Sequence, residues 1–206
     1  MPDRDASAQA YTRPVNAAAD PSRTILRRAV VADVPQMAAI INDAAELGLM
    51  LHKSHAKLYE NLREFHVIEH RGAGAASGPV VAVGGLSIIW ANLAEVVALA
   101  VHPDFRGHGL GRRLVEAAVE EARTLGVRKV MGLTYEQAFF ERLGFAVVDR
   151  KNLPLKVWAD CVHCPKNAAC DEIAMVRVLE GVPDAAPAAP AAGGISLPVL
   201  AEERDP

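Results

Sequence analysis

The residues best suited to chemistry form one glycine-rich stretch near the middle of the chain. Residues 106–111 read Arg-Gly-His-Gly-Leu-Gly, between an apolar run at 96–101 and an amphipathic run at 110–125. Glycine has no Cβ atom, so backbone N–H groups in such a stretch can lie exposed and close together. At the start of a helix these groups and the helix dipole favour an anion, and Arg106 adds a fixed positive charge. The stretch therefore predicts a phosphate site, and a pyrophosphate fits it best.

The spacing of the glycines excludes two familiar phosphate-binding loops. Gly111 is followed by Arg112 and Arg113, so the Lys-Ser/Thr pair of the nucleotide P-loop is missing. The same residues do not match the G-x-G-x-x-G spacing of the dinucleotide-binding loop. A simpler alternative is a tight connection between a strand and a helix with no ligand.

A sheet with helices between its strands is expected to position this stretch. Apolar and alternating runs predict strands at 24–28, 65–70, 80–90, 94–101, 129–134, 145–148 and 173–179. Helices are expected to follow caps at Asp33 and Ser54 and to end near residues 47 and 62, and two more are expected at 109–125 and 137–143. Strands at both ends of the chain with helices between them predict a mixed α/β fold.

The helix at 109–125 has the clearest amphipathic pattern. Its apolar face predicts burial of Leu110, Leu114, Ala118, Ala122 and Leu125. The opposite face is expected to turn four charged side chains to water, namely Arg113, Glu116, Glu120 and Arg123.

Length and composition indicate one globular domain with two tails. The chain has 206 residues, a net charge of −3 and 51% hydrophobic residues. We expect a disordered leader at 1–22, a folded domain at 23–181 and a disordered Ala/Pro-rich tail at 182–206. The near-neutral charge gives no basic surface for nucleic acid, and no apolar run reaches the roughly 18 residues of a membrane span. The polar N-terminus does not resemble a signal peptide, so a cytoplasmic protein is expected.

A C-terminal segment at 156–172 carries all the cysteines of the chain. They are Cys161, Cys164 and Cys170. Such spacing can ligate zinc or an iron–sulfur centre, but three ligands fall short of a closed structural zinc site, and His163 or Asp171 would have to be the fourth. A redox pair of the first two cysteines is a second reading, and a loop with small buried thiols is the third.

Two motifs carry a resemblance to a known family. Arg-x-x-Gly-x-Gly directly after a strand that ends in Val-His-Pro resembles the acetyl-CoA-binding loop of the GCN5-related N-acetyltransferase (GNAT) superfamily. Residues 139–145, Phe-Phe-Glu-Arg-Leu-Gly-Phe, resemble its second signature. The resemblance implies a mostly antiparallel mixed sheet, flanked by helices, whose central strands splay apart like a V. It also implies that acetyl-CoA binds Leu99, Ala100, Val101, Arg106, Gly107, His108, Gly109, Leu110, Gly111 and Arg112.

A narrower resemblance is to the short, stand-alone N-acetylglutamate synthases. It is carried by residues 48–54, 58–60, 63–65, 95–101, 133–134 and 139–142. It implies an amino-acid acceptor, L-glutamate, whose amine attacks the thioester directly in a ternary complex at the head of arginine biosynthesis. The long forms add an arginine-binding kinase domain, for which this chain has no room, so direct feedback through such a domain is not expected. Relatives of this fold commonly dimerise, so the resemblance allows a homodimer.

The resemblance also implies catalytic roles. Glu95 is the candidate base that takes the proton of the amine, directly or through water. Many members protonate the leaving thiolate with a Tyr where this chain has Phe140. Tyr135 or Thr134 is therefore the candidate acid, and water is the alternative. The alternatives are non-catalytic: Glu95 would be a solvated residue at the strand edge, and Tyr135 would be an aromatic side chain that only packs.

An acceptor with two carboxylates should bind in a cationic pocket. Lys53 and Arg28 are the candidate ligands, and a solvated surface lysine is the alternative for Lys53. Arg27 and Arg28 alternate in direction along a strand, so at most one of them should face the pocket. Another acceptor, such as a different amine or a protein N-terminus, remains an alternative function. So does a non-catalytic acyl-CoA-binding module with the cysteines as a sensor.

Overall fold

The computed structural model describes residues 20–72, 75, 77–153 and 171–184, and these form one seven-stranded sheet. The strand order is β1-β2-β3-β4-β5-β7-β6. All neighbours are antiparallel except β4 and β5, which run parallel. The strands are β1 (Thr24–Arg28), β2 (Phe65–His70), β3 (Val80–Trp90), β4 (Leu93–Val101), β5 (Lys129–Thr134), β6 (Ala146–Val147) and β7 (Ile173–Val178).

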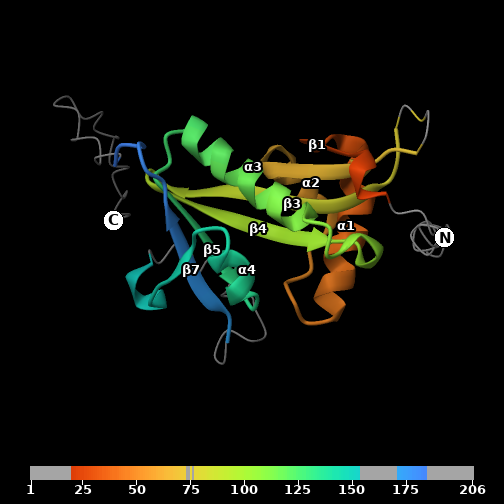
Figure 1. The fold of residues 1–206 in the computed structure, drawn as a ribbon. Coiled ribbons are helices and arrows are strands. Elements are labelled where there is room, and N and C mark those ends of the chain that lie inside the picture. Colours follow the sequence, from red (N-terminus) through yellow and green to blue (C-terminus); the bar gives the residue numbers. More distant parts are fainter. Residues whose placement is uncertain (1–19, 73–74, 76, 154–170, 185–206) are drawn as a thin grey trace, which may run out of the picture.

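Helices cover both faces of the sheet (Figure 1). They are α1 (Val34–Glu46), α2 (His55–Glu60), α3 (Leu110–Thr124) and α4 (Gln137–Glu141). One apolar core packs α1 and α2 on β2 and β3, and a second packs α3 and α4 on β4, β5 and β7. No helix among the described residues is long and apolar enough to span a bilayer. The predicted mixed α/β fold is confirmed.

The central strands separate as the family resemblance implies. β4 and β5 are paired only over their first three residues, where Leu93 to Glu95 face Lys129 to Met131. Beyond Glu95 each strand keeps its outer neighbour, β3 or β7, and the two strands diverge. This divergence opens a gap in the middle of the sheet, and Figure 1 shows the two strands spreading from a common origin.

The turn after α4 is tighter than predicted. The helix ends at Glu141 rather than near residue 143, because Leu143 and Gly144 make turn-type bonds to Phe140 and Glu141. Phe145 also belongs to this turn, since its N–H donates to the Phe140 carbonyl, so β6 is shorter than the predicted strand at 145–148.

Two predictions on α3 are wrong. Leu125 is 56% exposed, because the helix ends at Thr124 and Gly126, at φ +74°, turns the chain away. Arg113 does not simply face water but donates to the hydroxyl and carbonyl of Thr24 on β1. The buried face instead includes Val115 and Val119, neighbours of the predicted apolar stripe.

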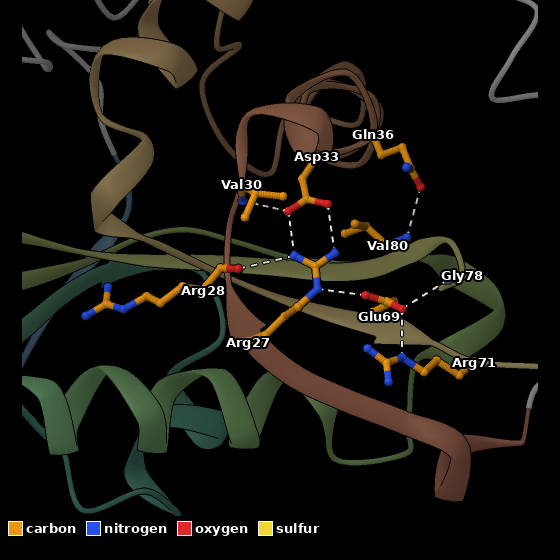
Figure 2. Close-up of polar contacts among 9 residues, drawn as sticks. All are labelled: Arg27, Arg28, Val30, Asp33, Gln36, Glu69, Arg71, Gly78 and Val80. Carbon is orange, nitrogen blue, oxygen red and sulfur yellow. Dashed lines mark hydrogen bonds and ion pairs between the residues drawn. The ribbon is translucent and has the colours of Figure 1, made fainter. Parts of the chain in front are cut away.

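Asp33 does not cap α1 as predicted. Its carboxylate instead accepts two bonds from the Arg27 guanidinium, at 2.6 and 2.9 Å, and one from the Val30 N–H at 2.8 Å. Arg27 Nε also donates to Glu69 at 2.7 Å, and Glu69 accepts from Arg71 as well (Figure 2). Both carboxylates are almost fully buried, so this network ties the start of α1 to the β1–β2 edge.

Candidate active site

A cavity of about 910 Å³ opens where β4 and β5 separate. Its wall comes from the α1–α2 loop, the diverging half of β4, the turn into α3, and the segment from the end of β5 into α4. The glycine-rich turn and the aromatic-rich segment after β5 therefore both line this cavity. Among the predicted site residues that line it are Lys53, Glu95, Leu99, Ala100, Val101, Arg106, Gly107, Gly109, Leu110, Gly111, Arg112, Thr134 and Tyr135.

The glycine-rich turn has the geometry of an anion cradle. Gly107 and Gly109 have φ values of +79° and +76°, in the left-handed region that glycine enters without strain. Gly109 is the N-cap of α3, so the next N–H groups lack intrahelical acceptors and point out of the helix start. Arg106 is exposed and donates through Nε to the Val101 carbonyl at 3.1 Å, which fixes its guanidinium beside the turn. His108 is exposed but is not among the lining residues.

The β4 wall of the cavity carries a bulge. Val83 pairs with Ala100 and Gly85 with Val97, so two residues of β4, Ala98 and Leu99, lie opposite one residue of β3. Ala98 has a φ of +49°, the one positive φ outside glycine among the described residues. A bulge interrupts the ladder and re-aims its backbone groups, here on a strand that lines the cavity.

Thr134 and Tyr135 form the wall opposite this bulge. Counting three residues from the last β4–β5 pair, Glu95 and Met131, brings Ala98 and Thr134 to the same level of the gap. Thr134 is 8% exposed, and its Oγ1 accepts a bond from the Glu136 N–H at 2.8 Å. The hydroxyl proton remains able to donate toward another group.

Glu95 stands where the gap begins. It is half-buried in the middle of the sheet, paired with Ser87 of β3 and with Met131 of β5. Ala98 of the bulge lies three positions farther along β4, which is roughly 10 Å along the strand axis. A water molecule would be needed to link its carboxylate to a group bound at the bulge.

Phe140 stands at the position where the family resemblance implies a tyrosine. It is 5% exposed and packs edge-on against Phe139 and Phe145, and its ring lies over Gly132 of β5. The ring supplies an apolar wall and no proton donor.

Arg28, predicted to bind the acceptor, is not among the lining residues. Its guanidinium forms an ion pair with Glu121 of α3 and donates to the Arg63 carbonyl at 3.0 Å. It therefore serves the packing of β1 against α3 at the far edge of the sheet. Arg27 is engaged in the buried network of Figure 2, so neither arginine of β1 supplies charge to the cavity.

The Arg28–Glu121 pair has a histidine beside it. His66 Nδ1 lies 3.7 Å from the Glu121 carboxylate. Burial lowers the pKa of His66, the positive charge of Arg28 lowers it further, and Glu121 offsets this in part. His66 is therefore neutral over a wider pH range than a free histidine.

The cationic side chains that do line the cavity come from other segments. Lys53 enters from the α1–α2 loop, and Arg142 follows α4. With Arg106 and Arg112 at the glycine-rich turn, they give the wall positive charge in several places. Arg142 was missed because it lies inside an aromatic-rich signature, where it reads as an exposed helix-end residue.

The predicted metal or redox residues Cys161, Cys164 and Cys170 lie outside the described residues. Within the described part of the chain, no group of three or more His, Cys, Asp or Glu side chains could hold a metal ion. A zinc or iron–sulfur site at the cysteines stays a prediction.

Comparison with known proteins identifies the class. The acetyltransferase (GNAT) family matches residues 37–145. An uncharacterized N-acetyltransferase of Chlorobaculum tepidum is 37% identical over 156 residues, which cover 76% of this chain and 97% of that protein. The chain belongs to the GNAT family and is an acetyl-CoA-dependent N-acetyltransferase, which confirms the resemblance and sets aside the non-catalytic module.

Its relatives include amino-acid acetyltransferases. The amino-acid acetyltransferase of Mycobacterium tuberculosis is 36% identical over 62% of this chain and 71% of that protein. A crystal structure of an M. tuberculosis protein in complex with CoA and a compound designated NLQ has a TM-score of 0.65 and 30% identity, over 75% of this chain and 99% of that chain. The N-acetylglutamate synthase from Neisseria gonorrhoeae was solved in complex with coenzyme A and N-acetyl-glutamate. Its structure has a TM-score of 0.67 and 26% identity, over 76% of this chain and 35% of that chain.

Proposed function

We propose that this chain transfers the acetyl group of acetyl-CoA to the amine of L-glutamate, the N-acetylglutamate synthase reaction that opens arginine biosynthesis. The observation that carries the proposal is one cavity that joins a phosphate cradle to a lysine. The cradle lies at the start of α3 and Lys53 on the α1–α2 loop. The amino-acid acetyltransferase of M. tuberculosis and the synthase complexed with N-acetyl-glutamate support this choice of acceptor.

Acetyl-CoA binding is assigned to the turn and to β4. The N–H groups that follow Gly109 and the side chain of Arg106 would hold the pyrophosphate. The pantetheine arm would then run along the diverging half of β4 and bring the thioester to the bulge at Ala98. A backbone N–H of the bulge would donate to the thioester oxygen, where negative charge develops as the amine attacks.

The acceptor amine attacks the thioester carbonyl after it has lost a proton. Glu95 would accept that proton through a water molecule, because the bulge lies roughly 10 Å farther along β4. The new C–N bond forms as the C–S bond breaks, and CoA leaves as a thiolate. Tyr135 or Thr134, opposite the bulge, would return a proton to this sulfur, with water as the alternative donor since Phe140 has no hydroxyl.

Lys53 would bind one carboxylate of the acceptor. Its ammonium is compact and carries three donors, so it suits a carboxylate without a fixed bidentate geometry. The other carboxylate would use backbone N–H groups of the cavity wall or a second cation such as Arg142. Arg28 is not part of this proposal.

A basic amine is the second candidate acceptor. Three carboxylates, Glu95, Glu136 and Glu172, line the same cavity and would favour a substrate with more than one positive charge. An acceptor of this kind would not need Lys53.

A panel assay tests both candidates. The purified protein is incubated with acetyl-CoA and one acceptor at a time, and free CoA is followed with a thiol reagent. Release that depends on glutamate supports the proposal, and acetylated glutamate is then identified by mass spectrometry. Release with polyamines or other amines but not with glutamate would overturn it and favour the second candidate.

A further inference from the structure

We infer that Asn42 is a positioning residue for the acceptor, because it fixes the backbone of Lys53 and thereby the place of the Lys53 ammonium in the cavity. Asn42 lies on α1 and is not among the residues that line the cavity. The inference rests on the proposed function, in which Lys53 binds a carboxylate of the acceptor.

The contact between Asn42 and Lys53 is a pair of hydrogen bonds. The Lys53 N–H donates to Asn42 Oδ1 at 2.9 Å, and Asn42 Nδ2 donates to the Lys53 carbonyl at 3.1 Å. One side-chain amide thus binds both backbone groups of one residue, as a neighbouring strand would. Two bonds to the same residue set its orientation as well as its position. Both bonds are partly buried, which protects them from competition with water.

The loop around Lys53 has two other restraints in its middle, the packing of Met50 against the core beside α1 and the contact of His52 with Glu46. It begins after α1, where the N–H groups of Gly48 and Leu49 bond back to Ala45 and Ala44. It ends at Ser54, whose side chain accepts from the Lys57 N–H and caps α2. The residues between these anchors belong to no helix or strand. Asn42 is the α1 side chain that bonds the backbone of Lys53 itself.

A second tie to the same loop offers a comparison. The Glu46 carboxylate bonds His52 Nε2 at 2.8 Å, but both side chains are more than half exposed and neither lines the cavity. This tie holds the loop through a side chain and does not touch the Lys53 backbone. Loss of the Glu46 contact should therefore loosen the loop at His52 while the two hydrogen bonds from Asn42 keep the Lys53 backbone in place.

The position of the Lys53 ammonium depends on the position of the Lys53 backbone. Its side chain is long and flexible, so a fixed Cα reduces the volume in which the ammonium moves. The amide of Asn42 is a donor and an acceptor at once, and no apolar residue or simple carboxylate replaces both. An aspartate at 42 would keep an acceptor for the Lys53 N–H but would place negative oxygen near the Lys53 carbonyl.

The test compares Asn42→Leu with Glu46→Leu, and each variant removes one of the two ties to the loop. Steady-state kinetics with glutamate and acetyl-CoA should show a glutamate KM about tenfold higher in Asn42→Leu, the expected loss for two hydrogen bonds, with the acetyl-CoA KM within about twofold. Glu46→Leu should leave both values within about twofold of the parent. Hydrogen exchange should show a faster Lys53 amide in Asn42→Leu only. Asn42→Asp keeps the size of the side chain and should raise the glutamate KM severalfold. This variant replaces Asn42→Leu in the test if Asn42→Leu folds poorly.

A double-mutant cycle with Lys53→Met separates this inference from the proposed function. If Asn42 acts through Lys53, adding Asn42→Leu to Lys53→Met changes the glutamate KM by less than about twofold. A full tenfold change in both backgrounds would show that Asn42 supports the pocket as a whole and would overturn the inference. A glutamate KM raised by Lys53→Met but not by Asn42→Leu would also overturn it and leave the proposed function standing. A glutamate KM unchanged by Lys53→Met would remove the proposed acceptor contact and this inference together.

Discussion

At the scale of single residues, the position of Glu95 decides what kind of base it can be. It lies at the last paired level of β4 and β5, and the bulge at Ala98 lies three residues farther on. Direct contact with an amine at the bulge would need the carboxylate to span roughly 10 Å, which a glutamate side chain does not reach. A water molecule would close that distance, so a change at Glu95 should act on proton transfer more than on binding.

Glu95→Gln is therefore expected to lower kcat by about 10² or more while leaving the acetyl-CoA KM close to the parent value. The amide keeps the shape of the side chain and loses the ability to accept a proton. Glu120→Gln, an exposed carboxylate on α3, is the matched control and should behave like the parent. A kcat within twofold of the parent in Glu95→Gln would contradict the assignment.

At the scale of elements, α3 has a glycine in the left-handed region at each end. Gly109 precedes its first residue at φ +76°, and Gly126 follows its end at φ +74°. A Cβ atom built on either glycine would meet no other atom within 4 Å. Alanine at these two positions would therefore cost stability through backbone strain alone. The two sites differ in one respect: only Gly109 lines the cavity.

This symmetry makes a matched pair of substitutions. Gly109→Ala and Gly126→Ala should each lower the free energy of unfolding by about 1 kcal/mol. Only Gly109→Ala should also raise the acetyl-CoA KM, because strain there displaces the N–H groups that we propose as pyrophosphate ligands. Thermal melts and kinetics on both variants measure the two effects. A similar rise in the acetyl-CoA KM for Gly126→Ala would show that loss of stability, and not the cradle, is responsible.

Gly111 is expected to respond less than Gly109 to the same change. It lies inside the first turn of α3, and a Cβ atom there would stand 3.5 Å from the Phe139 ring, an ordinary contact. Gly111→Ala should therefore change the acetyl-CoA KM less than Gly109→Ala does. The reverse order, measured in the same assay, would mean that phosphate approaches the backbone at Gly111 instead.

At the scale of the molecule, local sequence patterns predicted the helices and strands, whereas contacts between residues far apart in the sequence were not predicted. The strands β1, β2, β3 and β5 have the predicted bounds because apolar runs and turn residues define them within a few positions. The glycine-rich turn before α3 was predicted for the same reason, because its glycines lie within a few positions of one another. The pairing of Arg28 with Glu121 joins residues 93 positions apart, so nothing near Arg28 in the sequence signals it. Ala98 and Asn42 gave no signal either, since alanine is not typical of a positive φ and Asn42 reads as a polar helix surface.

The whole molecule should also respond to acid in two steps, and the first belongs to His66. Its pKa in the folded protein lies below the ordinary value of 6.5, because burial and Arg28 disfavour its charge. As pH falls through 6.5, the unfolded chain takes up this proton first, so stability falls until the folded pKa is passed. His66→Gln should remove this step, and melting temperatures between pH 7.5 and about 5 measure it. His55→Gln, an exposed histidine of α2, should keep it. An unchanged pH profile in His66→Gln would contradict this account.

The second step belongs to Glu69. Burial alone would raise its pKa, but bonds from Arg27, Arg71 and the Gly78 N–H outweigh this and hold the pKa below the ordinary 4.5. The stability that these bonds give is present above pH 4.5 and is lost as pH falls through the folded pKa. Glu69→Gln should be less stable than the parent at pH 7, because it leaves Arg27 with one carboxylate partner instead of two. Below pH 4.5 the difference in melting temperature between the two proteins should shrink, because the parent then loses the same charge. A difference that stays constant down to pH 3 would mean that packing, and not the charge of Glu69, holds this edge of the sheet.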